Sequence, residues 1–209
     1  DFPWQENFDS LLIGTFDQIC WSNEHIAGSG SSLFSISNSA WGIGGNTTNM
    51  LSLSYMAAGT YTQLVLPEMD IPAAECYDLI LDIYRQNGSR YPGEGVYILA
   101  ETDTLAFVPN DYAAIGQNIP AETEAAWYTY RFTLPRRGTL RIAFLARSEY
   151  GNRICIDNLS VEHNGKVPSA ILQSYGTDNR TIKIIHGGQV YIVRDDKTYN
   201  LLGQSVEIQ

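Results

Sequence analysis

The sequence predicts an all-β protein: an antiparallel two-sheet jelly-roll sandwich followed by a small C-terminal β-meander. Roughly eight apolar, β-branched or aromatic runs are separated by Gly, Pro, Asn and Asp, and no run shows a sustained helical period. With 209 residues and 44% hydrophobic residues, the chain is large enough to bury a substantial core. The expected strands are Ser32–Ser37, Asn49–Tyr55, Gln63–Leu66, Tyr77–Arg85, Gly95–Glu101, Trp127–Leu134, Thr139–Arg147 and Ile154–Val161.

The connections between these runs add two expectations. Pro135–Gly138 joins two neighbouring runs closely, which predicts a hairpin. Gln117–Ala126 is the segment best suited to a short helix or an ordered loop. The sandwich is therefore expected to contain at most this one short helix.

The sequence changes character after residue 162, which predicts two domains, 1–165 and 166–209. His163–Ser169 is typical of a linker or a long turn. Short apolar runs separated by turn residues follow, and they predict a hairpin meander too small to be stable by itself. These runs are Thr181–Ile185, Gln189–Arg194, Thr198–Leu202 and Ser205–Ile208.

Composition excludes several classes of protein. A net charge of −10 and a pI near 4.6 argue against nucleic acid and anionic membranes as partners, since both require clustered Lys and Arg. No stretch approaches the length of a membrane span. The chain begins at Asp1, as expected after removal of a signal peptide or for a segment of a longer protein.

The three cysteines, Cys20, Cys76 and Cys155, contain no C-x-x-C pair, so zinc and thioredoxin-like chemistry have no support. We expect three buried free thiols. A Cys20–Cys76 disulfide is the alternative.

Asp157 stands inside an apolar, β-branched run, R-I-C-I-D-N-L-S-V. Regular alternation along a strand would place Asp157 on the same face as Cys155, Leu159 and Val161, and therefore in the core. A buried carboxylate must be paired, hydrogen-bonded or bound to a metal. Two solutions stay open: a bound cation, or a bulge at residues 157–158 with the carboxylate capped by backbone N–H groups.

Several motifs, in their order along residues 1–162, resemble the MAM-like or cleaved-adhesin family of jelly-roll domains. They are W-Q-E-N-F-D at the start, N-M-L-S-L-S-Y, T-Q-L-V-L-P-E-M-D-I-P, Y-D-L-I-L-D-I-Y and I-C-I-D-N-L-S-V. The tail, with its Y-N-L-L-G-Q stretch, is similar to the C-terminal segments of secreted and surface proteins of Bacteroides-type bacteria. Similar tails serve as sorting signals, although this one is shorter.

The resemblance implies a jelly-roll sandwich, a secreted or cell-surface location, and a non-catalytic role in adhesion or binding. Family members often hold structural calcium, and the matching acidic positions are Asp9 and Asp157. Calcium takes about six to eight oxygens, so loop carbonyls would have to complete the set. An early Asp-rich loop that is frequent in the family is replaced here by Cys20–Glu24, which gives no support to a second ion.

Aromatic residues are the candidates for ligand contact, because a sugar ring can stack on an aromatic face. The predicted ligand-binding residues are Trp41, Tyr91, Tyr112 and Trp127, of which Tyr91 and Tyr112 occupy loop-like sequence. The alternative is that most aromatics are core residues, as is usual in sandwiches. Alternation places Tyr128 and Tyr130 on one face of their strand and Trp127 on the other.

Catalytic motifs are absent from the sequence. The three histidines lie in different regions without metal-ligand spacing, and no G-x-S-x-G elbow occurs. The favoured hypothesis is a non-enzymatic surface module that binds glycan or protein. The alternatives are a carbohydrate-active hydrolase, its ancillary binding domain, or a purely structural module. A hydrolase would need two carboxylates facing each other across a groove, and Asp82 and Glu101 are one arbitrary example of such a pair.

Overall fold

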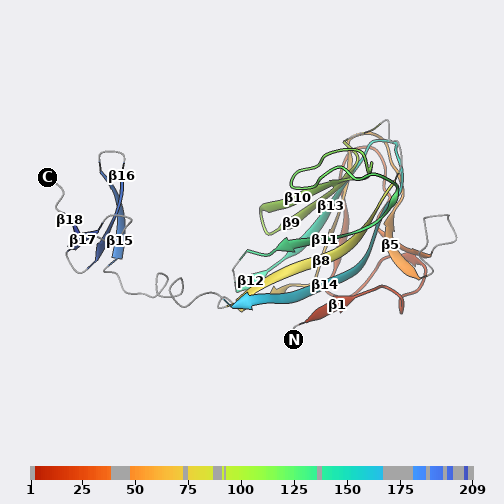
Figure 1. Ribbon diagram of the computed structural model, residues 1–209. Helices are drawn as coiled ribbons and strands as arrows, with labels where there is room; N and C mark the ends of the chain where they lie inside the picture. Colours follow the sequence, from red (N-terminus) through yellow and green to blue (C-terminus); the bar gives the residue numbers. More distant parts are fainter. Residues whose placement is uncertain are drawn as a thin grey trace. The chain divides into compact units, whose positions relative to one another are not determined.

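The computed structural model describes residues 3–38, 48–72, 75–86, 91, 93–135, 138–166, 181–186, 189–194, 197–199 and 205–206. The chain divides into two compact units, Asp1–Gly165 and Lys166–Gln209. In Figure 1 the first unit consists of strands and loops throughout. No helix long and apolar enough to span a bilayer occurs in the described part of the chain.

The larger sheet of the first unit has seven strands in the order β11-β8-β14-β5-β4-β2, with β1 also paired to β14. These strands are β1 (Trp4–Glu6), β2 (Gly14–Thr15), β4 (Ser35–Asn38), β5 (Asn49–Leu53), β8 (Glu75–Arg85), β11 (Ala126–Thr133) and β14 (Ile154–Lys166).

The second sheet has five strands in the order β10-β9-β13-β6-β3. They are β3 (Ser22–Ala27), β6 (Thr60–Val65), β9 (Gly95–Ala100), β10 (Asp103–Pro109) and β13 (Ile142–Ser148). A separate two-stranded ribbon joins β7 (Met69–Asp70) to β12 (Thr139–Leu140). The predicted antiparallel two-sheet jelly-roll sandwich is confirmed.

The core of the sandwich lies between the two sheets. Alternate residues of the longer strands face inward, for example Leu79, Leu81 and Ile83 of β8 and Ile142 and Phe144 of β13. This is the alternation that the sequence showed, and it determines which side chains remain on the outward faces.

The predicted hairpin at Pro135–Gly138 is wrong. Strand β11 pairs with β8, whereas β12 pairs with β7, so the chain leaves one sheet here instead of folding back beside itself. The run Thr139–Arg147 is also divided, because β12 and β13 belong to different sheets. The segment 117–126 contains no helix and is an ordered loop up to the start of β11.

Asn158 interrupts the alternation of β14. Its φ is +49°, in the left-handed region that non-glycine residues rarely adopt. Before it, Ile156 faces the main core while Cys155 belongs to a separate small cluster; after it, Leu159 faces the core. The expectation that Cys155 and Leu159 share a face is therefore wrong, because one extra residue reverses the order of the faces.

Two buried polar groups hold the loops at one end of the sandwich. The Glu94 carboxylate is completely buried and accepts backbone N–H bonds from Glu149, Gly151 and Asn152, at 3.1, 2.8 and 2.5 Å. It also accepts the Asn110 side-chain amide at 2.8 Å. The second group, Arg85, is equally buried. Its guanidinium donates to the carbonyls of Pro109, Asp111, Ala114 and Pro120 and to the Tyr130 hydroxyl.

The second unit is a four-stranded antiparallel meander in the order β15-β16-β17-β18. The strands are β15 (Thr181–His186), β16 (Gln189–Arg194), β17 (Lys197–Tyr199) and β18 (Ser205–Val206). Each strand pairs with the next along the chain, as the short apolar runs predicted. The sorting role suggested by the tail stays a prediction.

All three cysteines are free thiols, which agrees with the favoured expectation over the Cys20–Cys76 disulfide. Only Cys155 is fully buried; Cys76 is half-buried and Cys20 is exposed, so the expectation of three buried thiols is wrong for two of them. Burial raises the pKa of the Cys155 thiol to about 12, with Arg153 acting weakly in the opposite direction.

We expect Glu94→Gln to lower the free energy of unfolding by about 2–3 kcal/mol, because an amide NH₂ would face N–H donors where an oxygen accepts now. Gly151→Ala should also destabilise the fold, since a Cβ at this position would lie 2.4 Å from the Glu94 carboxylate. Urea unfolding measures both effects. The exposed Glu124→Gln is the matched control, and equal midpoints for Glu94→Gln and this control would contradict the prediction.

The thiols should differ in reactivity. At pH 8 we expect iodoacetamide to modify Cys20 readily in the native protein and Cys155 only after denaturation, because the latter is inaccessible and protonated. Mass spectrometry of the labelled peptides measures this. Rapid native modification of Cys155 would show that β14 is not packed as described.

Candidate ligand-binding face

The outward face of the five-stranded sheet carries aromatic and aliphatic side chains where a solvated sheet would carry polar ones. Their positions alternate with the core positions of β6, β9, β10 and β13, so they point away from the core. All are half-buried: Tyr61, Val65, Tyr97, Leu99, Phe107 and Leu145. A contiguous apolar surface on a sheet is a recognised mark of a binding site.

Strand register shows that these side chains are neighbours. Phe107 lies opposite Tyr97, and their ring centroids are 4.5 Å apart. Tyr97 lies opposite Leu145, which in turn lies opposite Gln63. The row ends at Glu24 on the edge strand β3. Five strands about 4.8 Å apart make this row about 19 Å long.

Arg147 places a charged group within the aromatic surface. It lies opposite Tyr61, and its guanidinium contacts the Glu149 carboxylate in a very short ion pair. Burial acts to lower the pKa of Arg147, but the charge of Glu149 and, further, Tyr61 and Tyr97 raise it, and the net shift is upward. The side chain therefore stays cationic, and its buried Nε has no hydrogen-bond partner among the described residues.

A groove of about 750 Å³ opens beside β3 and β6 at the edge of this face. Gln63 and Val65 belong to both the face and the groove, so the two are continuous. Its polar groups include Ser22, whose hydroxyl donates to Glu24 at 2.5 Å, and the Glu68–Arg141 ion pair at 2.9 Å. Trp21 supplies an aromatic wall.

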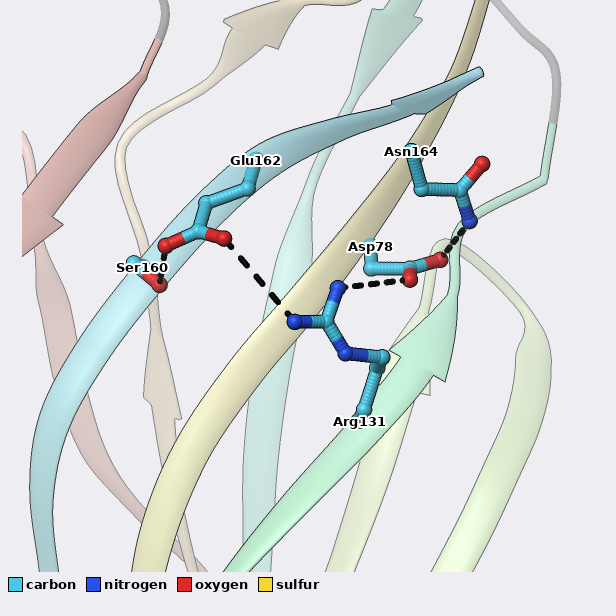
Figure 2. Close-up of polar contacts among 5 residues, drawn as sticks. All are labelled: Asp78, Arg131, Ser160, Glu162 and Asn164. Atoms are coloured by element: carbon cyan, nitrogen blue, oxygen red, sulfur yellow. Dashed lines mark hydrogen bonds and ion pairs between the residues drawn. The ribbon is translucent and has the colours of Figure 1, made fainter.

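The outward face of the seven-stranded sheet is different, because its polar groups satisfy one another (Figure 2). Asp78 has a nearly buried carboxylate, which accepts Arg131 at 3.0 Å and also the amide of Asn164. Arg131 reaches Glu162 at 3.9 Å, and Ser160 donates to Glu162 at 3.2 Å.

Further along the same face, the Asp82 carboxylate accepts Thr129 at 2.5 Å and Asn158 at 2.8 Å. Hydrogen-bonding capacity on this face is thus largely used within the protein. The apolar face of the five-stranded sheet is the better candidate for a ligand.

The sequence-predicted ligand residues belong to one strand, to two loops and to a segment outside the described residues. Trp127 lies on β11, half-buried against Tyr84 with ring centroids 5.5 Å apart. Tyr91 and Tyr112 lie in the β8–β9 and β10–β11 loops, and Trp41 lies outside the described residues. These four assignments stay predictions.

Sequence reasoning did not select Tyr61, Phe107 or Arg147. The sequence does contain an indication of this surface: strands such as Y-T-Q-L-V and G-V-Y-I-L-A carry apolar residues at both odd and even positions, and therefore on both faces. Such strands are either buried by protein on both faces, or they have one face buried in the core and the other available to a ligand.

The predicted calcium pair occupies two unlike environments. Asp157 is buried, with 2% of its surface exposed, and its Oδ1 accepts the Asn158 backbone N–H at 2.8 Å. This is the capping that the bulge alternative predicted. Asp9 is exposed, and its carboxylate accepts the Asn7 amide and the Asn49 backbone N–H.

A calcium cage is not evident from these residues. Within the described ranges no three His, Cys, Asp or Glu side chains come together as metal ligands. The described donors therefore fit calcium only if carbonyl and amide oxygens supply most of the ligands. Asp9 and Asp157 stay a prediction as a metal pair.

The two sheets and their order define a jelly-roll sandwich, the class of fold found in adhesin domains. The K1 cleaved adhesin domain of Lys-gingipain from Porphyromonas gingivalis W83 matches with a TM-score of 0.56 and 18% identity, covering 79% of this chain and all (100%) of that one. The K2 cleaved adhesin domain of Lys-gingipain matches with a TM-score of 0.54 and 18% identity, covering 78% and 99%. The resemblance predicted from the motifs is thus confirmed at the level of the fold.

Enzymes share this fold as well. The Stig cyclase Fisc from Fischerella sp. TAU, in complex with an indole derivative, matches with a TM-score of 0.50 and 14% identity, covering 77% of this chain and 94% of that one. No family model matches the chain, and no curated protein matches it. At these identities the comparisons establish the fold alone.

The calcium prediction is tested by thermal unfolding in millimolar calcium and in chelator. Calcium at 100 times its dissociation constant would stabilise the fold by about 2.7 kcal/mol, and Asp157→Asn should abolish the difference. Asp17→Asn, at an exposed loop position, is the matched control. Identical midpoints with calcium and with chelator would eliminate the structural ion.

Proposed function

We propose that this protein is a non-catalytic extracellular binding module that recognises glycan through the outward face of its five-stranded sheet. The observation that carries the proposal is the row of side chains Phe107, Tyr97, Leu145 and Gln63, with Arg147 beside it. These side chains alternate with the core positions of their strands and therefore point away from the core.

The chemistry of this face suits a polyhydroxylated ligand. Aromatic rings such as Tyr97 and Phe107 offer flat apolar surfaces against which the C–H faces of a sugar ring can lie. Carboxylate, amide and guanidinium groups at Glu24, Gln63 and Arg147 can donate to and accept from hydroxyls. A mostly apolar surface with a few polar groups is the usual composition of a small-molecule site.

A binding role is preferred to catalysis on the arrangement of the described residues. His25 lies on β3 and His163 on β14, in different sheets. Asp82 and Glu101, the arbitrary carboxylate pair considered from the sequence, belong to β8 and to the end of β9, again in different sheets. The acidic residues of the seven-stranded face are engaged with Arg131, Thr129 and asparagines, and no observation favours the hydrolase alternative.

The cleaved adhesin domains of Lys-gingipain support an adhesive role for the same fold in this chain. An extracytoplasmic location is part of the proposal, because it is the location that this role requires. A protein ligand on the same face is the alternative partner.

The test is a glycan array followed by calorimetry with a glycan that binds. We expect Tyr97→Ala and Phe107→Ala each to weaken binding by about five- to tenfold, because stacking on one aromatic ring contributes on the order of 1–1.5 kcal/mol.

Two variants serve as comparisons. Tyr55→Ala removes an aromatic side chain that is 62% exposed but lies outside this face, and it should leave binding unchanged. Trp127→Ala tests the sequence-based assignment on the other sheet. If Trp127→Ala abolishes binding while Tyr97→Ala retains it, the binding site lies on the seven-stranded sheet and our assignment to the five-stranded sheet is wrong. If no glycan on the array binds, glycan recognition is rejected.

A further inference from the structure

A second groove, of about 580 Å³, lies beside the ribbon strand β7 and shares only Pro67 and Glu68 with the groove at the edge of the aromatic face. Met69 and Tyr77 are almost buried within it, and Trp4 of β1 is half-buried. Its exposed polar groups are the carboxylates of Glu68 and Asp70. The remaining lining residues are Pro67 and Pro72.

We propose that this groove binds a lysine or arginine side chain of an extended basic peptide on a partner protein. The site is distinct from the glycan-binding face, and the proposal does not depend on glycan recognition.

The first argument is the combination of aromatic rings and carboxylates in one groove. An ammonium or guanidinium group is attracted to the face of an aromatic ring, most strongly to tryptophan, and the attraction increases as the site is shielded from water. Trp4 and Tyr77 supply the rings, and the alkyl part of a basic side chain would contact Met69 and the prolines.

The second argument is charge. Glu68 and Asp70 lie on the exposed part of the groove, and Tyr77 donates to a further carboxylate, Glu75, at 2.7 Å. None of the groove residues is basic, and the whole chain has a net charge of −10. Complementarity therefore favours a cationic occupant over an anionic or a neutral one.

Two basic residues approach the groove from outside. His163 packs edge-on against Tyr77, with ring centroids 5.6 Å apart, and its Nε2 lies 3.8 Å from the Glu75 carboxylate. Arg141 pairs with Glu68 at 2.9 Å, but both side chains are more than half exposed, at 63% and 51%. An ion pair exposed to this extent is weak. A peptide cation can displace it, and Asp70 forms no salt bridge within the described part of the chain.

The test uses the full chain, labelled with ¹⁵N, and the peptide acetyl-Gly-Lys-Gly-Lys-Gly-amide. Titration followed by NMR should shift the backbone amides of residues 68–71. The Nε-acetylated form of the same peptide has no charge and should bind at least about tenfold more weakly, because the cation–π and ionic attractions are lost. Binding should also weaken as salt is increased.

Variants at the exposed carboxylates test the site without disturbing the core. Asp70→Asn and Glu68→Gln should each weaken binding about threefold, and the double variant about tenfold. Glu124→Gln makes the same charge change in the β10–β11 loop and should have no effect. Trp4→Phe keeps a ring but weakens the cation–π attraction, so it should lower affinity by a few-fold in a protein that remains folded.

Three results would overturn the inference. Equal binding of the acetylated peptide would show that the groove recognises something other than charge. Shifts confined to residues of β6, β9 and β13 would assign the peptide to the aromatic face. Equal affinities of the double variant and of Glu124→Gln would show that the acidic residues of the groove are not involved.

Discussion

Backbone pairing along β14 is the interaction on which the rest of the sandwich depends. This strand pairs with β5 through residues 154–156 and with β1 through residues 159–161, while β8 lies on its other side. The first and last strands of the first unit are thereby joined in one sheet, as the adjacent β1 and β14 in Figure 1 show. Between the two pairings stands Asn158, whose left-handed conformation reverses which side of the strand faces the core. Asp157 is buried at this junction, so the carboxylate that is conspicuous in the sequence marks a structural joint.

The same two-residue alternation gives the two sheets outward faces that differ in chemistry, although the seven-stranded face also carries the aromatic pair Tyr84 and Trp127. On the seven-stranded sheet, cross-strand pairs such as Thr129–Asp82 and Arg131–Asp78 satisfy each other, which leaves few donors or acceptors for a ligand. On the five-stranded sheet, Tyr97, Phe107 and Leu145 are half-exposed, and the polar groups beside them are Arg147 and Gln63. A polar face whose groups satisfy one another gains little from a partner, whereas an apolar face gains by being covered.

Buried charges support the loops in a way that no local sequence pattern indicates. Arg85 is the last residue of β8 and would ordinarily be read as a strand end facing water. Instead its donors bind the carbonyl of the last residue of β10, three carbonyls of the β10–β11 connection and one tyrosine hydroxyl, which explains how a long connection without a helix stays ordered. Glu94 does the same for the turn after β13 through backbone N–H groups. The segment Gln117–Ala126, for which the sequence allowed either a short helix or an ordered loop, belongs to a loop ordered in this way up to the start of β11.

The sequence by itself determined the class of fold and most of the strands, since period-two alternation and turn residues are local properties. It also limited Asp157 to a small set of outcomes, one of which, capping at a bulge, is present. Only the tertiary structure decided that β11 and β12 part at Pro135–Gly138, that Cys155 and Leu159 face different clusters, and that Tyr61, Phe107 and Arg147 share a surface. The reason is physical: pairing partners and register are set by contacts between residues far apart in the chain, and one left-handed residue reverses every face that follows it.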